Sequence, residues 1–389
     1  MISRNRVRSG YRPAKGRHRR TISHESNPFR QIRRDSRASR PVVCNENRNS
    51  GGDKMLILRK PYLLYLGTEV DPRTAKTAFG IRDWAADACI GQFREAADTV
   101  DLRLPDLCPS EAAAGGAGSL IVGIAPTGGA IPISWHAALL EAARCGLDIV
   151  SGMHFRLGEV PGLREAATQG GGKLIDVRVP PVDIPVASGR RRTGNRLLTV
   201  GTDCAQGKKY TALALAAAMR ARGEATDFRA TGQTGIIISG NGIPMDAVVS
   251  DFIAGAAEML SPDNTSQHWD IIEGQGALHH PAYAAVTLGL IHGSQPDVLV
   301  LCHESGRREI AEYPGYPIAP LADVAEAYLA AARLTNPAVR LGAVSLLTAH
   351  LSDDECAREL HMAKRELGVP AFDPMRTSMS GAITSILTP

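Results

Sequence analysis

The chain has 389 residues, room for roughly two or three domains, and 44% of them are hydrophobic, so a sizeable core can be buried. Only 22% are charged, and no apolar run reaches the ~18 residues of a membrane helix, which argues against a transmembrane helix. The seven cysteines are odd in number and lack CxxC spacing, which argues against a disulfide framework or structural zinc and favours the reducing cytoplasm.

The net charge of +4 hides an uneven distribution. Residues 1–54 hold 15 Lys/Arg and 4 Asp/Glu, whereas the remainder holds 29 and 36. Because the basic segment lacks apolar periodicity, we expect it to be disordered. It fits a nucleic-acid-binding arm, a transit peptide, or untranslated sequence before a true start at Met55, since Gly51-Gly52-Asp53 can be encoded by a purine-rich ribosome-binding run. We favour the last interpretation and expect no nucleic-acid partner for the folded part.

Residues 55–188 alternate short apolar runs with a helical pattern. A helix is expected over 133–146, where apolar residues recur at helical spacing before a glycine. Strands are expected at 61–67, 119–126, 147–154 and 173–180. This alternation predicts a parallel, Rossmann-like sheet, although no GxGxxG follows the first strand to indicate a dinucleotide site.

A proline-, glycine- and arginine-rich stretch ends in the predicted linker, residues 189–195, and a second α/β domain is expected over 196–389. That domain opens with a strand, a glycine loop and a helix, at 197–200, 201–207 and 208–222. Further strands are expected at 235–239, 269–274, 297–303 and 339–348. The predicted fold is therefore α/β, a Rossmann-like domain followed by a phosphate-loop domain.

The glycine loop has the ingredients of a phosphate-binding loop. Glycines let backbone N–H groups point at phosphate oxygens, and the following helix end and lysine add positive charge. The predicted binding residues are Gly201, Thr202, Asp203, Cys204, Ala205, Gln206, Gly207, Lys208 and Lys209. Lys209 takes the place of the usual magnesium-binding hydroxyl, and Thr211 lies about 200° further round the helix. We therefore expect a phosphate-bearing ligand without a metal, such as coenzyme A.

Two resemblances follow from these motifs. The loop GTDCAQGKK and the segment WDIIEGQG resemble the phosphate-loop and acidic motifs of dethiobiotin synthetase. A longer resemblance is to the D-glutamate N-acetyltransferases, a family once catalogued as a domain of unknown function. It is carried by GIRDW (80–84), the GTDC loop and the long segments 229–258, 268–304 and 332–340. The resemblance covers about residues 58–388. It implies a Rossmann-like domain, a phosphate-loop domain, and transfer of acetyl from acetyl-CoA to the amine of D-glutamate in D-amino-acid breakdown.

Acetyl transfer requires a base, because the substrate ammonium must lose a proton before it attacks the thioester. Glu273, at the end of a predicted strand, is the first candidate, with Asp270 behind it. His280 is the competing base or an oxyanion donor. No tight metal-ligand spacing occurs among the histidines of this region, so no metal is expected.

A dicarboxylate substrate calls for guanidinium groups. Arg82, Arg229 and Arg307 are the candidates, together with the polar loop TGQTG, whose Thr231, Gln233 and Thr234 are predicted to contact the amino acid. The expected partner is a small amino acid rather than a membrane, and we expect a homo-oligomer. The chief alternative is an ATP-dependent ligase or kinase of the dethiobiotin synthetase type.

Overall fold

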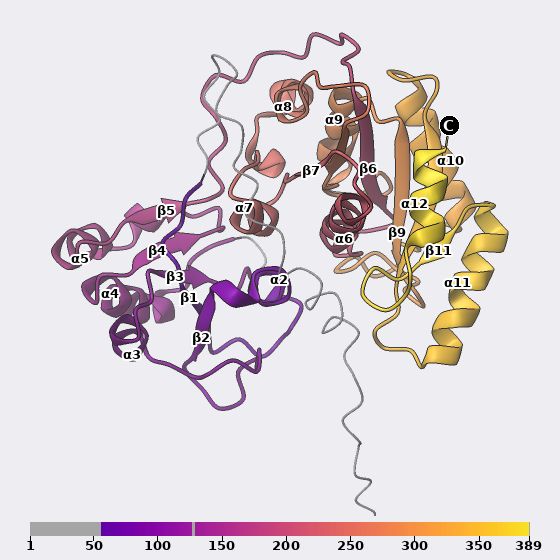
Figure 1. Ribbon diagram of the computed structural model, residues 1–389. Coiled ribbons are helices and arrows are strands. Elements are labelled where there is room, and N and C mark those ends of the chain that lie inside the picture. The colour runs from indigo at the N-terminus through magenta and orange to yellow at the C-terminus, as the bar shows by residue number, and fades with distance from the viewer. Residues whose placement is uncertain (1–55, 127–128, 389) are drawn as a thin grey trace, which may run out of the picture. The chain divides into compact units, whose positions relative to one another are not determined.

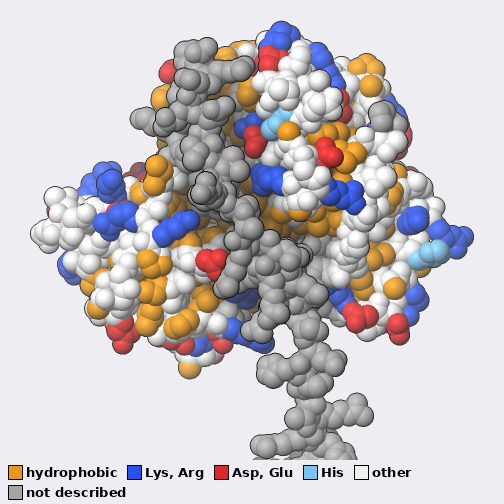
Figure 2. Space-filling view, in the orientation of Figure 1, with side chains coloured by type: hydrophobic (Ala, Val, Ile, Leu, Met, Phe, Trp, Pro, Cys, Tyr) orange, Lys and Arg blue, Asp and Glu red, His pale blue; other side chains and the backbone are white. Residues whose placement is uncertain are grey.

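The computed structural model describes residues 56–126 and 129–388 (Figure 1). The expectations for residues 1–54 and for a start at Met55 fall outside this described part. Two parallel β-sheets organise the rest, as the apolar runs predicted. On the face seen in Figure 2, acidic and basic side chains are interspersed, as on an ordinary solvated protein surface.

The first sheet has the strand order β2-β1-β3-β4-β5, and all its neighbours run parallel. Its strands are β1 (Tyr62–Gly67), β2 (Cys89–Arg94), β3 (Ser119–Val122), β4 (Asp148–Ser151) and β5 (Leu174–Asp176). Its helices are α2 (Lys76–Trp84), α3 (Pro109–Ala114), α4 (His136–Arg144) and α5 (Leu163–Gly170).

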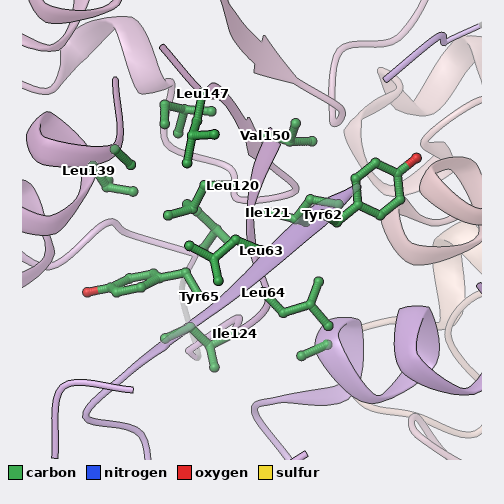
Figure 3. Close-up of a cluster of buried hydrophobic side chains, with 14 of the residues drawn as sticks. Tyr62, Leu63, Leu64, Tyr65, Leu120, Ile121, Ile124, Leu139, Leu147 and Val150 are labelled. Carbon is green, nitrogen blue, oxygen red and sulfur yellow. The ribbon is translucent and has the colours of Figure 1, made fainter. Parts of the chain in front are cut away.

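Strand β1 forms the centre of the first core. All six of its residues are buried, and their side chains point alternately to the two faces of the sheet (Figure 3). Leu63, Leu64 and Tyr65 are fully buried among Leu120, Ile121 and other apolar side chains. Burial on both faces requires a continuous apolar run rather than an alternating one, which is why PYLLYLG reads so clearly as a strand.

The second sheet has the strand order β11-β10-β9-β6-β8-β7, again with parallel neighbours. Its strands are β6 (Asn195–Gly201), β7 (Thr226–Arg229), β8 (Trp269–Ile272), β9 (Val298–Glu304), β10 (Arg340–Leu347) and β11 (Ala371–Phe372). Its helices are α6 (Lys208–Ala221), α7 (Gln233–Ser239), α8 (Ile253–Leu260), α9 (Ala284–Ser294), α10 (Leu321–Arg333), α11 (Asp353–Leu367) and α12 (Ser380–Leu387).

Strand β6 lies between β8 and β9, so the segments that leave these three strands meet at one edge of the sheet. The glycine loop follows β6, and Glu273 follows β8 directly. Open α/β sheets bind ligands at the carboxyl ends of their strands, at the point where successive strands are added on opposite sides of the first one. The fold therefore brings the two motifs of the sequence together.

The expectation of a strand at 235–239 is wrong, because these residues belong to helix α7. A short apolar run such as GIIIS is compatible with a buried strand or a buried helix. Ile236 and Ile237 of α7 pack into the core of the first sheet, and α7 lies beside α2 (Figure 1). A helix from the second half of the chain thus completes the first core.

The predicted linker lies against the second domain. Arg190 and Arg191 form ion pairs with Asp263 and Asp297, and the buried Arg192 donates to the carbonyl oxygens of Ser261 and Gly293. Each of the three arginines in the predicted linker is therefore bound to the second domain. No helix in the described ranges is both long and apolar enough to cross a membrane.

Candidate active site

The loop between β6 and α6 has the conformation of a phosphate-binding loop. Gly207 has a φ of +85°, and a Cβ there would lie 2.8 Å from Leu347, so a glycine is required where the chain turns into α6. Lys208 begins that helix, and its Nζ donates a 2.8 Å hydrogen bond back to the carbonyl oxygen of Asp203. Burial lowers the pKa of Lys208. A buried ammonium held over the loop beside a helix N-terminus is suited to an anionic ligand.

Asp203 gives the loop its shape. Its fully buried carboxylate accepts hydrogen bonds from Arg307 Nη1 at 3.0 Å, from the Ala311 amide at 2.8 Å and from the Cys204 amide at 2.5 Å. Arg307 also donates to the Cys204 carbonyl oxygen at 3.2 Å and pairs with Glu304. The guanidinium predicted to hold substrate is therefore committed to the loop.

His280 lies against the same carboxylate. Its Nδ1 accepts from the amides of Ala282 and Tyr283 at 3.0 and 3.3 Å, so the proton of a neutral ring is on Nε2, which lies 3.7 Å from Asp203 Oδ1. Burial lowers the pKa of His280, against the opposing charge of Asp203. Because its Nδ1 lone pair accepts two backbone amides, the neutral ring offers no free lone pair for a substrate proton.

The other loop residues are held by neighbouring strands and helices. Thr202 Oγ1 is 2.9 Å from His303 Nδ1, and Tyr328 donates to the carbonyl oxygen of Gly201 at 2.8 Å. Gln206 accepts from the Glu304 amide, and its buried Nε2 has no partner among the described residues. Burial raises the pKa of the Cys204 thiol, which therefore does not have the acidity of an activated nucleophile.

Lys209 leaves the loop and extends toward helix α2. Its Nζ lies 3.4 Å from the carbonyl oxygen of Lys76, and a Cβ on Gly80 would be only 2.6 Å from that Nζ. Burial lowers the pKa of Lys209 to about 8, although the charge of Glu273 opposes the shift. The residue in the usual metal-ligand position thus contacts the first domain, and Gly80 of GIRDW makes room for it.

The rest of GIRDW contacts the same helix. Asp83 accepts a 2.6 Å hydrogen bond from the Tyr210 hydroxyl, and the Trp84 ring meets the Tyr210 ring edge-on at 6.2 Å. Arg82 pairs with Asp83 at 2.6 Å, and its guanidinium lies over the Phe79 ring, with part of the side chain exposed. This motif therefore joins α2 to the start of α6.

Glu273 is held differently from the other acids of the site. Its Oε2 accepts the amides of Thr231 and Gly232 at 3.0 and 3.1 Å, whereas its Oε1 has no hydrogen bond from a described residue. Burial raises the pKa of Glu273, against those two amides and the charge of Lys209. A buried carboxylate with one open oxygen and a raised pKa has the properties of a general base.

The TGQTG segment precedes and opens helix α7 instead of starting a strand. Thr231 Oγ1 donates to the carbonyl oxygen of Glu273 at 2.6 Å, and Thr234 Oγ1 is 3.0 Å from Thr77 Oγ1 in the first domain. Gln233 packs against Gly152 at the end of β4. The segment therefore joins Glu273 to the carboxyl edge of the first sheet, where the contact surface of the two domains lies.

Known proteins share this combination of domains. A family model described as a domain of unknown function, P-loop domain (DUF1611_C), matches residues 185–383, and its Rossmann-like partner (DUF1611_N) matches residues 91–180. A crystal structure of a DUF1611 family protein from Anabaena variabilis superposes with a TM-score of 0.76 at 32% identity, covering 84% of this chain and 99% of its own.

Two curated relatives align over nearly their whole lengths. The D-glutamate N-acetyltransferase of Tritonibacter scottomollicae is 45% identical over 320 residues, 82% of this chain and 96% of the relative. The D-glutamate N-acetyltransferase of a Pseudoalteromonas species is 40% identical over 329 residues, 85% of this chain and 99% of the relative.

The chain belongs to the DUF1611 family. Its resemblance to N-acetyltransferases, read from the motifs, is confirmed, and the protein is an acyltransferase of that kind. The succession of a Rossmann-like and a P-loop domain is confirmed as well.

Two predicted site residues of this DUF1611 protein lie away from its loop. Asp270 is in register with Arg196, near the start of β6, whereas the loop follows the end of that strand. Its carboxylate accepts from Arg229 Nε at 2.8 Å, from Ser261 Oγ at 2.5 Å and from His268 at 3.2 Å. Side chains three apart on a strand point to opposite faces, so Asp270 does not stand behind Glu273. The structure likewise engages Arg229 with this cluster and not with the loop.

Among the described residues, two groups of side chains have atoms close enough for a cation, namely Asp203, Cys204 and His280, and Asp227, His268 and Asp270. In each group an arginine already pairs with the carboxylates, Arg307 in the first and Arg229 in the second. An arginine at these oxygens competes with a metal, and the expectation that no metal is needed stays a prediction.

The sequence reasoning missed one cluster at the carboxyl edge of the first sheet. Arg178, after β5, pairs with Asp246 of the second domain at 3.1 Å and contacts His154, which follows β4. The Arg178 side chain is 10% exposed, and its Nε has no partner in the described ranges. Asp246 is close enough to raise the pKa of Glu273. The basic residue within KLIDVRVP was the only signal, and it lay inside the predicted strand 173–180, whereas β5 ends at Asp176.

Proposed function

We propose that this N-acetyltransferase transfers acetyl from acetyl-CoA to the amine of D-glutamate and forms N-acetyl-D-glutamate in D-amino-acid catabolism. The D-glutamate specificity named for both curated relatives supports the acceptor. One observation supports acetyl-CoA as the acyl donor. The phosphate loop has a buried lysine, Lys208, but the position that normally binds magnesium is Lys209, which is directed at α2 and away from the loop.

The loop residues fit the phosphates of coenzyme A. Lys208 can turn from the Asp203 carbonyl oxygen to a phosphate oxygen, while the amides of residues 205–207 and the start of α6 supply further donors. A diphosphate bound there leaves the pantetheine arm free to extend over the carboxyl edge of the second sheet. The thioester then reaches the space between the domains, where Glu273 and α7 lie.

Glu273 accepts the proton in this proposal. The substrate ammonium gives a proton to Oε1, directly or through one water, and the free amine forms a bond to the thioester carbonyl carbon. The carbon–sulfur bond then breaks, and the departing thiolate takes up a proton. The positive charge of Lys209 lowers the pKa of Glu273 and so favours the ionised carboxylate, in opposition to burial, which raises that pKa.

Arg229 and Arg307 are bound to the buried carboxylates of Asp270 and Asp203. We therefore assign the two carboxylates of the acceptor to Arg178, whose Nε has no partner among the described residues, and to Arg82, which pairs with Asp83 but is partly exposed. Thr231, Gln233 and Thr234 are retained as candidate contacts because they border Glu273 and the first domain.

The cellular setting and assembly are part of the same proposal. Six cysteines in the described ranges are free thiols, which supports a reducing cytoplasmic environment. A homo-oligomer is expected, and size-exclusion chromatography with light scattering measures it.

An assay of acetyl-CoA with a panel of D- and L-amino acids, read by mass spectrometry of the product, tests the function. N-acetyl-D-glutamate should dominate, and chelating divalent metals should not slow its formation. Magnesium-dependent nucleotide hydrolysis with no acetylated product would instead support a ligase or kinase.

A further inference from the structure

A shallow, largely open cavity lies beside the phosphate loop, next to the end of β9, whereas Glu273 follows β8 on the other side of β6. Its volume is about 490 Å³. His303, Arg307 and Arg308 line it on one side, and residues 318–321 with Glu366 line it on the other. Ile318, Ala319, Pro320 and Leu321 give this second wall an apolar surface.

The cavity shares a wall with the loop. His303, at the end of β9, contacts the hydroxyl of Thr202 through Nδ1 at 2.9 Å. Arg307 donates to Asp203 at 3.0 Å and to the carbonyl oxygen of Cys204 at 3.2 Å. His303 and Arg307 therefore line the cavity and contact the loop at the same time, so the two lie side by side.

Most of the charges around the cavity are already paired. Arg307 is bound to Asp203 and Glu304, and Glu366 accepts the amide of Ala322 in the first turn of α10. Arg308 differs, because among the described residues no hydrogen bond or ion pair involves its side chain. The exposed Arg308 side chain lines the cavity and carries a full positive charge with no partner among the described residues.

The backbone of Arg308 is nevertheless fixed. Its carbonyl oxygen accepts the amide of Ile318 at 2.8 Å, and the next residues pair through Glu309 and Pro317 and through a hydrogen bond from the Ile310 amide to Tyr316. An unpaired guanidinium on a fixed turn, beside an apolar wall and a phosphate loop, is the arrangement that a phosphorylated nucleoside requires.

We propose that this cavity binds the adenosine 3′-phosphate portion of the acyl donor, with Arg308 contacting the 3′-phosphate. The inference rests on the proposed donor. The adenosine lies against the apolar wall formed by residues 318–321, the diphosphate lies in the loop, and the pantetheine arm leaves in the opposite direction, toward Glu273. Arg308 thereby lets the enzyme distinguish coenzyme A from nucleotides that lack the extra phosphate.

Steady-state kinetics with acetyl-CoA and acetyl-3′-dephospho-CoA test this subsite. The wild-type Michaelis constant should be about tenfold higher for the dephospho donor, because a charge-assisted contact is lost. Arg308→Gln should raise the constant for acetyl-CoA to the same extent, leave the constant for the dephospho donor unchanged, and leave the turnover number unchanged. Arg358→Gln makes the same charge change on an exposed residue of α11 outside the cavity wall, and should keep the wild-type discrimination.

The subsite proposal is overturned if Arg308→Gln still distinguishes acetyl-CoA from the dephospho donor, or if the wild type does not distinguish them. Either result leaves the acetyltransferase proposal intact. Absence of turnover with both donors and every amino acid tested would contradict the proposed function itself, and the subsite with it.

Discussion

Asp270 and Glu273 are separated by two residues on and just after strand β8, and both carboxylates are buried, yet their surroundings differ in every respect that governs chemistry. Asp270 lies near the start of the strand, where Arg229, Ser261 and His268 all contact its oxygens. Glu273 lies at the carboxyl edge, where two backbone amides share one of its oxygens and the other has no hydrogen bond from a described residue.

The two acids titrate in opposite directions. Although burial pulls the pKa of Asp270 upward, the hydrogen bonds from His268, Ser261 and Arg229 and the Arg229 charge hold it below its ordinary value of 3.8. Burial raises the pKa of Glu273 above 4.5 because only two amides and a more distant lysine oppose it. An acid with an arginine partner stabilises the fold, whereas an acid without one can take up a proton at neutral pH.

Replacing Glu273 by glutamine should have the largest effect. The change keeps the shape and an oxygen for the two amides but removes the base, so the turnover number should fall by about 10²–10⁴. The Michaelis constant for acetyl-CoA should change little, because the loop is untouched. Asp270→Asn is the matched control on the same strand and should keep near-wild-type turnover.

Asp270→Asn should instead weaken the fold. The change removes the buried partner of Arg229, which keeps only the half-exposed Asp227, and should cost on the order of 3 kcal/mol of unfolding free energy. Because the folded pKa of Asp270 is depressed, its contribution is present above about pH 4 and is lost as the pH falls through the folded value. The stability difference between wild type and Asp270→Asn in urea denaturation should therefore shrink toward pH 3.

The same experiment on Glu273→Gln should show the opposite sign. The raised pKa means that the ionised Glu273 opposes folding as the pH rises above about 4.5, so the glutamine variant should be at least as stable as wild type at pH 7. A clear loss of stability in Glu273→Gln, comparable with that of Asp270→Asn, would make both acids structural and remove the contrast between them.

Lys208→Ala tests the loop beside Glu273. Losing a charge-assisted contact with a phosphate should cost about 1.5–3 kcal/mol, which corresponds to a rise of roughly tenfold or more in the Michaelis constant for acetyl-CoA. Lys364→Ala, an exposed lysine of α11, is the control. An unchanged constant, or activity that chelating agents abolish, would contradict a metal-free phosphate site.

The smallest expected effect is a change in pH dependence. Lys209 is cationic below its pKa of about 8, and its charge lowers the pKa of Glu273. Lys209→Met removes that charge, so the acid limb of the turnover profile should move to higher pH, while Lys209→Arg should keep it near the wild-type position. An acid limb that does not move in Lys209→Met would show that the two groups are not coupled.

Much of the fold could be predicted from the sequence because buried parallel strands appear as continuous apolar runs. Strands β1, β3, β6, β9 and β10 and helices α4 and α6 follow from such runs and their glycine ends. Strand β2 was missed because CIGQFR mixes apolar and polar residues, and β7 because TDFR is short and charged. Helix α7 was mistaken for a strand because only its packing against the first core decides its conformation.

The candidate site was predictable only in part. The loop, its lysine and an acid after the next strand are local patterns, and the parallel sheet brings them to one edge. The pairing of Arg229 with Asp270 and of Arg307 with Asp203 joins residues far apart in the chain, so no sequence pattern could show that these guanidinium groups are occupied. The contact of Lys209 with α2 likewise depends on how the two domains pack.

Turnover of Glu273→Gln measured side by side with His280→Gln tests the central claim most directly. The proposed mechanism predicts a loss of about 10²–10⁴ in the first variant and a much smaller loss in the second, because the lone pair of His280 Nδ1 already accepts two backbone amides. Near-wild-type turnover in Glu273→Gln together with a large loss in His280→Gln would contradict the account and make the histidine the base.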